Sequence, residues 1–89
     1  MRYPYMTMAD ETEISHSSMA ADGTVKVYFE TPCQGGFHHA TCVLPGYQWK
    51  EMQGYSQAEI KSFDVFLHDN AHLILEFAQT GGFAHAAAV

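Results

Sequence analysis

The strongest constraint on the fold is an amphipathic segment in the second half of the chain, from Gln57 to about Gln79. Its apolar residues recur at spacings of three and four, the period of an α-helix with one buried face. The central stripe consists of Ile60, Phe63, Leu67, Ala71, Ile74 and Ala78, and it is widened by Phe66, Leu73 and Phe77. We therefore predict one long helix that covers the strand-rich first half of the chain.

Signals at both ends define the limits of this helix. A capping box begins at Ser56, whose hydroxyl can accept a hydrogen bond from the Glu59 amide while the Glu59 carboxylate accepts one from the Ser56 amide. Tyr55 and Ile60 flank the box as a hydrophobic staple. The Gly81-Gly82 pair is expected to end the helix, because glycine adopts the left-handed C-cap conformation without steric cost.

The first half of the chain carries strand patterns. From Thr24 to Glu30 apolar and polar side chains alternate, and this period of two predicts a half-buried strand. The residues expected to face the core are Val25, Val27 and Phe29. Phe37–Leu44 is rich in residues that favour strands, Tyr47–Met52 is a candidate short strand around Trp49, and Met1–Asp10 is a candidate edge strand.

Turn residues separate these strands. Ala21-Asp22-Gly23 contains the Asp-Gly pair that commonly joins antiparallel strands. The prolines and glycines predict a loop over Thr31–Gly36 and a stop at Pro45-Gly46. The residues from Thr12 to His16 are too mixed in polarity for an assignment.

Strands followed by one long helix predict an α+β fold, a small antiparallel β-meander of three or four strands with the C-terminal helix packed on one sheet face. We assign residues 1–82 to a single domain and expect residues 83–89 to form a flexible tail. One helix covers only one sheet face. The other face must be solvated or covered by a second copy, and the second option predicts a homodimer.

The charge of the chain limits its partners. Ten Asp and Glu against four Lys and Arg give a formal charge of −6. The four cations are separated along the chain at Arg2, Lys26, Lys50 and Lys61. Binding of nucleic acid or of an anionic membrane needs clustered Lys and Arg, so neither is expected.

A cytoplasmic location is the default expectation. The start of the chain, Met1–Met8, lacks the apolar core of a secretory signal, and no stretch approaches the roughly 20 apolar residues that span a bilayer. Cys33 and Cys42 are too few for a disulfide framework, so we expect both to be thiols.

A row of polar side chains on the predicted helix is a candidate metal site. Asp64, His68, His72 and Glu76 follow one another at intervals of four, and two histidines at i and i+4 can reach one ion. A solvated helix face carrying such residues is the simpler interpretation, so no metal or other cofactor is assigned. The run from His68 to His72 differs from the zinc-protease signature because Asp69 stands in place of the water-activating Glu.

No catalytic site is predicted. Cys33 lies near His38 and His39, and a neighbouring imidazole can activate a thiol. The surroundings of Cys33 match no cysteine-protease signature, however, and adjacent histidines in a strand point to opposite faces. We therefore expect a protein that is not an enzyme.

Three aromatic residues just before the helix, Tyr47, Trp49 and Tyr55, form a candidate interaction surface. Tyr and Trp combine a large apolar area with a polar tip, which suits protein interfaces. A small domain also needs aromatic residues for its core, and this alternative stays open.

Two resemblances accompany these patterns. The segment Gly54–Ile60, followed by Asn70, Leu73 and Phe77, resembles a family of short bacterial proteins with a small β-meander and a helix that opens on Gly-aromatic-Ser-x-x-Glu-Leu. Members are often encoded in toxin–antitoxin-like pairs. The whole chain, from its Met1–Tyr5 start onward, also resembles short proteins of bacterial mobile elements. Neither resemblance implies an activity.

Taken together, these patterns favour a small non-enzymatic protein-interaction module that acts as a homodimer. It would bind another protein through its sheet face or through the segment from Tyr47 to Tyr55. The alternative is a metal-binding protein that uses His68 and His72. A third hypothesis, an acidic inhibitor that mimics nucleic acid, would need the carboxylates on one surface.

Overall fold

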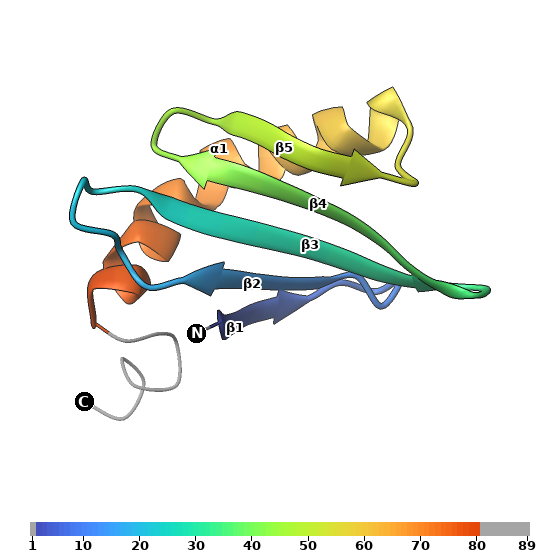
Figure 1. Ribbon diagram of the computed structural model, residues 1–89, viewed down its shortest axis with the longest axis horizontal. Coiled ribbons are helices and arrows are strands. Elements are labelled where there is room, and N and C mark those ends of the chain that lie inside the picture. The colour runs from blue at the N-terminus through green and yellow to red at the C-terminus, as the bar shows by residue number, and fades with distance from the viewer. Residues whose placement is uncertain (1, 81–89) are drawn as a thin grey trace.

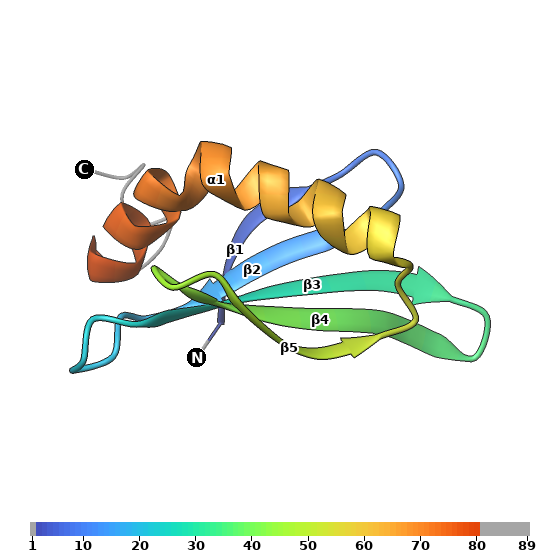
Figure 2. The same cartoon turned by 90° about the horizontal axis from the view of Figure 1, so that it is seen from above.

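Five strands precede a single helix in the computed structural model, which describes residues 2–80. The elements are β1 (Arg2–Thr7), β2 (Glu13–Ser17), β3 (Val25–Cys33), β4 (Gly36–Leu44), β5 (Gln48–Gln53) and α1 (Gln57–Thr80). Each strand pairs antiparallel with the next, in the order β1-β2-β3-β4-β5 (Figure 1). Helix α1 lies across one face of this sheet (Figure 2). The α+β class is confirmed, with five strands instead of the three or four predicted.

Strand β2 contains most of the segment Thr12–His16, which is too mixed in polarity for an assignment from the sequence. Its core-facing residues are Ile14 and His16, which are 1% and 0% exposed. The imidazole of His16 donates from Nδ1 to the carbonyl oxygen of Ser17 at 2.8 Å, whereas its buried Nε2 has no hydrogen-bond partner within residues 2–80. A histidine in a core position removes the apolar alternation by which a strand is recognised, so the pattern was ambiguous there.

The prediction of a loop over Thr31–Gly36 is wrong. Strand β3 continues to Cys33 and β4 starts at Gly36, with Pro32 opposite Phe37. Beyond Glu30, β3 pairs with β4 alone, and the two form a ribbon that extends past the sheet (Figure 1). One side of β3 is free in this ribbon, and proline is tolerated on such an edge. The other assigned strands and the turns at 21–23 and 45–46 are confirmed.

The core lies between the sheet and α1. The predicted alternation in β3 is confirmed, since Val25, Val27 and Phe29 are at most 1% exposed. The buried helix residues are Phe63, Leu67, Ala71, Ile74 and Ala78.

The residues expected to widen the apolar stripe of α1 are less buried than its centre. Phe66 and Phe77 are half-buried against the ring of Tyr5, at 6.2 and 6.1 Å between centroids. Leu73 lies on the same side of α1, but its side chain is shorter and is 36% exposed. Contrary to the prediction, Leu73 therefore lies outside the core.

The start of α1 follows the predicted capping box. Ser56 N donates to Glu59 Oε1 at 2.8 Å, and Glu59 N donates to Ser56 Oγ at 3.1 Å. Two otherwise unpaired amides are thereby satisfied, which fixes where the helix begins. The predicted stop at Gly81-Gly82 and the tail 83–89 lie outside the described residues.

Gly54 allows the chain to turn from β5 into α1. Its φ is +91°, and a Cβ built there would overlap the imidazole carbons of His38. We predict that Gly54→Ala lowers the free energy of unfolding by about 1–3 kcal/mol, because the new methyl group meets both backbone strain and a clash. Urea unfolding measures this loss.

Gly46 provides the matched control. A Cβ at Gly46 meets only Gln48 Cγ, at 4.0 Å. Gly46→Ala is expected to change the free energy of unfolding by less than about 0.5 kcal/mol. Equal losses in the two variants would contradict the strain at Gly54.

Burial makes the fold sensitive to alkaline pH. Desolvation, with a smaller contribution from the Asp64 carboxylate, raises the pKa of Cys42 to about 12, and burial also raises the pKa of Tyr5 and Tyr55. A raised folded-state pKa contributes stability that is present below the unfolded-state pKa and is lost as pH rises toward the folded-state value.

We therefore predict that the free energy of unfolding falls above about pH 9, by up to about 1.4 kcal/mol per pH unit for the fully buried Cys42, with smaller contributions from the partly exposed Tyr5 and Tyr55. Urea unfolding across this range measures the slope. Cys42→Ala should make the decline shallower, whereas Cys33→Ala, which alters an exposed thiol, should leave it unchanged. A flat profile would rule out this linkage.

Candidate functional site

Trp49 is anchored between the sheet and the helix. It lies on β5 opposite Cys42, half-buried, with its ring centroid 5.5 Å from that of Phe29. Its indole N–H donates to Asp64 Oδ1 of α1 at 3.1 Å. Trp49 therefore contributes to the core while part of its surface remains open.

Tyr55 is held by a chain of hydroxyl groups. Its hydroxyl donates to the backbone oxygen of His38 at 3.2 Å and lies 2.7 Å from Thr31 Oγ1, which in turn lies 2.6 Å from Thr12 Oγ1. The ring packs edge-on against Phe63, with 5.0 Å between centroids. These contacts tie the segment before α1 to β3, to β4 and to Thr12, the residue that precedes β2.

Tyr47 is separate from this pair. Its ring stacks on the imidazole of His68, with 3.9 Å between centroids and 13° between planes. His68 Nδ1 donates to the backbone oxygen of Asp64 at 2.9 Å and lies 3.6 Å from the Asp64 carboxylate. The three predicted aromatic residues are thus all half-buried, and they do not form one exposed cluster.

A groove of about 480 Å³ runs between β5 and the first turns of α1. We call it the Trp49 groove, and its lining includes Trp49, Met52, Tyr55, Ile60, Lys61 and Asp64. Met52 is 51% exposed although it is apolar. The structure therefore brings Trp49 and Tyr55 together at one surface and adds Met52 and Lys61, which were not singled out from the sequence.

The helical row predicted as a candidate metal site is only partly assembled. His68 contacts Asp64, while His72 and Glu76 are exposed. Within residues 2–80 there is no group of three or more His, Cys, Asp or Glu side chains arranged to hold a metal ion.

The adjacent histidines of β4 point to opposite faces, as predicted. His38 packs against Tyr55 on the helix side of the sheet. His39 lines the open side, where its Nε2 lies 3.0 Å from Gln53 Oε1. Cys33 is exposed near the end of the β3–β4 ribbon. No hydrogen bond joins Cys33 to either histidine in the part of the chain that the structure describes.

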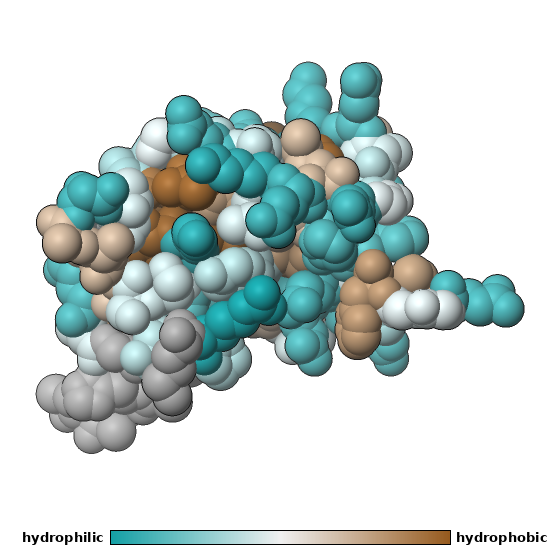
Figure 3. Space-filling view, viewed as in Figure 1, coloured by the Kyte–Doolittle hydropathy of each residue, from teal (hydrophilic) through white to brown (hydrophobic). Residues whose placement is uncertain are grey.

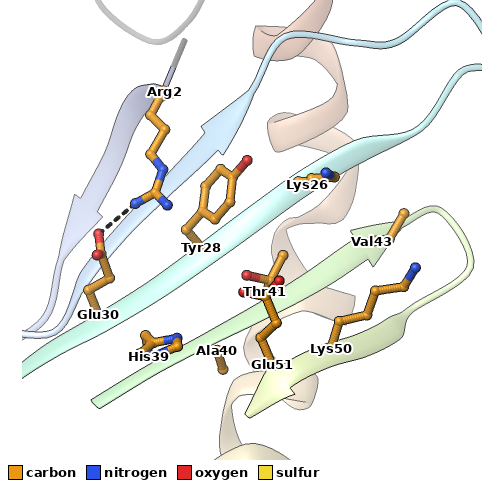
Figure 4. Close-up of a pocket in the computed structure, with 10 residues that line it drawn as sticks. All are labelled: Arg2, Lys26, Tyr28, Glu30, His39, Ala40, Thr41, Val43, Lys50 and Glu51. Carbon is orange, nitrogen blue, oxygen red and sulfur yellow. Dashed lines mark hydrogen bonds and ion pairs between the residues drawn. The ribbon is translucent and has the colours of Figure 1, made fainter. Parts of the chain in front are cut away.

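The face of the sheet away from α1 contains a second concave site of about 320 Å³ (Figure 4). We call it the open-face hollow. Its charged lining residues are Arg2, Lys26, Glu30, Lys50 and Glu51, and its other lining residues include Tyr28, His39 and Thr41. Figure 3 shows that hydrophilic residues cover most of this side of the molecule.

The sequence did not reveal this grouping of cations. Lys26 is 24 positions before Lys50, so the two appear isolated along the chain. The pairing of Lys26 with Val43 and of Lys50 with Thr41 places both lysines on the open face, on β3 and β5 with β4 between them. The alternation in β3, which assigned Lys26 to the solvent face, was the available signal.

Comparisons with known proteins give no relationship, since no family model, curated protein or solved structure matches the chain. The two resemblances therefore remain predictions. Within residues 2–80, no helix combines the length and apolar character needed to cross a membrane.

We predict that Zn²⁺ binds with the same weak affinity to the wild-type protein and to His72→Ala. Two imidazoles without a third ligand provide an incomplete site, and one of them is already stacked on Tyr47. Isothermal titration calorimetry measures this affinity. A clear loss of affinity in His72→Ala would support the helical metal site instead.

Proposed function

We propose that this protein is a non-enzymatic interaction module that forms a homodimer through the Trp49 groove. The observation that carries the proposal is the apolar surface that Trp49, Met52, Tyr55 and Ile60 leave open beside the start of α1. Aromatic residues and methionine are enriched at protein interfaces.

The small size of the domain supports a dimer. Chains shorter than about 100 residues bury a modest fraction of their apolar surface, and a second copy can cover the remainder. Met52 at 51% exposure and the half-buried Ile60 would gain most from such cover.

The charges beside the groove suit a second copy. Lys61 and Asp64 lie at its helical edge, and Lys61 has no ion-pair partner among residues 2–80. In a two-fold dimer every contact occurs twice, so Lys61 of each copy can pair with Asp64 of the other. A groove that carries both charges is therefore self-complementary.

A further protein partner and a cytoplasmic location belong to the same proposal. The metal-binding alternative, with His68 and His72, has less support because His68 is engaged by Tyr47 and Asp64. No specific observation favours it over the interaction module.

Size-exclusion chromatography with light scattering tests the proposal. We predict a dimer at micromolar concentration for the wild type, and monomers for Met52→Glu and for Lys61→Glu, because each introduces a negative charge into the groove. Val65→Glu adds a charge at another exposed apolar position of α1, 57% exposed, and should remain dimeric. A monomeric wild type, or equal dissociation of all three variants, would refute the groove as a dimer interface.

A further inference from the structure

The open-face hollow differs in charge from the rest of the molecule. Its three cations outnumber its two carboxylates, which gives a local formal charge of +1. The remaining residues contain one lysine and eight carboxylates, so the formal charge of −6 combines +1 on this site with −7 elsewhere. Folding has therefore concentrated three of the four cations on one sheet face.

Two of these cations are available to a ligand. Arg2 is occupied, since its Nη1 lies 3.0 Å from Glu30 Oε1 and its guanidinium lies 3.8 Å from the centre of the Tyr28 ring. Lys26 and Lys50 are exposed, and neither forms an ion pair within residues 2–80. Figure 4 shows them on β3 and β5, on either side of β4.

The outer edges of the sheet are poorly suited to adding a strand. In β1 the pairing register shifts between Pro4 and Met6, and proline lacks a backbone donor. In β5 the register shifts opposite the segment between His39 and Thr41, and Glu51 has a φ of +54°. Bulges and proline disrupt the regular hydrogen-bonding edge that another strand would need, so a partner is expected to use the face of the sheet.

We propose that the open-face hollow binds an acidic segment of a partner protein, whose carboxylates pair with Lys26 and Lys50. This site uses other residues than the Trp49 groove and does not depend on the homodimer. The unpaired ammonium groups and the local positive charge provide the complementarity.

A short acidic peptide fits this face better than a nucleic acid. A long polyanion would extend beyond the hollow toward surfaces that carry the remaining −7 charge, where it is repelled. Single-stranded nucleic acids also need open aromatic faces for base stacking. The Tyr28 ring has the Arg2 guanidinium over one of its faces.

The test uses a fluorescein-labelled hexaglutamate peptide and fluorescence anisotropy at low salt. We expect binding that weakens as salt is added, because the contacts are solvent-exposed ion pairs. Lys26→Gln and Lys50→Gln should each weaken binding about two- to fivefold, and the double variant about tenfold. Glu51→Gln should strengthen binding by a similar factor, because it removes the like charge from the hollow.

Val65→Glu is the matched control, since it changes the net charge by the same amount as each lysine variant but lies on α1. Its affinity for the peptide should equal that of the wild type. Circular dichroism verifies that each variant is folded. No peptide binding, equal weakening by Val65→Glu, or tighter binding of an oligothymidylate than of the peptide would each overturn the proposal.

Discussion

The packing of Phe29 against the helix is the interaction on which the arrangement depends. Phe29 lies on the central strand β3, is 0% exposed, and stacks on Phe63 of α1 with 4.5 Å between centroids and 16° between planes. Trp49 and Phe66 pack around the same ring. Full burial of one such side chain contributes about 1.5–3 kcal/mol, and this cluster sets the position of α1 over the sheet.

That position separates two surfaces with different chemistry. On the helix side, the Trp49 groove exists because Trp49 is held between Phe29 and Asp64 beside the start of α1. On the opposite side, no helix within residues 2–80 covers the sheet, and the open-face hollow contains Lys26 and Lys50 (Figure 2, Figure 4). We propose the apolar groove for a second copy and the charged hollow for an acidic partner segment. The two sites share no lining residue, so neither proposal depends on the other.

Most of the fold was predictable where a residue's environment follows from its neighbours along the chain. The capping box at Ser56 and the alternation in β3 are examples, because both arise from local backbone geometry. Strand β2 was missed because His16 occupies a core position. The end of β3 was missed because a strand accepts Pro32 only where no neighbour needs its backbone donor, and β2 pairs with β3 only as far as Glu30. Of the candidate site, Trp49 and Tyr55 were identified, whereas their separation from Tyr47 was not.

Local sequence was sufficient for the long helix, its starting residue, the central strands and the acidic net charge. The distribution of that charge required the folded chain. Lys26 and Lys50 share a face because antiparallel pairing and a period of two bring distant residues together, and composition carries no information on such pairing. The same holds for the Trp49 groove, which arises where β5 and α1 meet across the aromatic core.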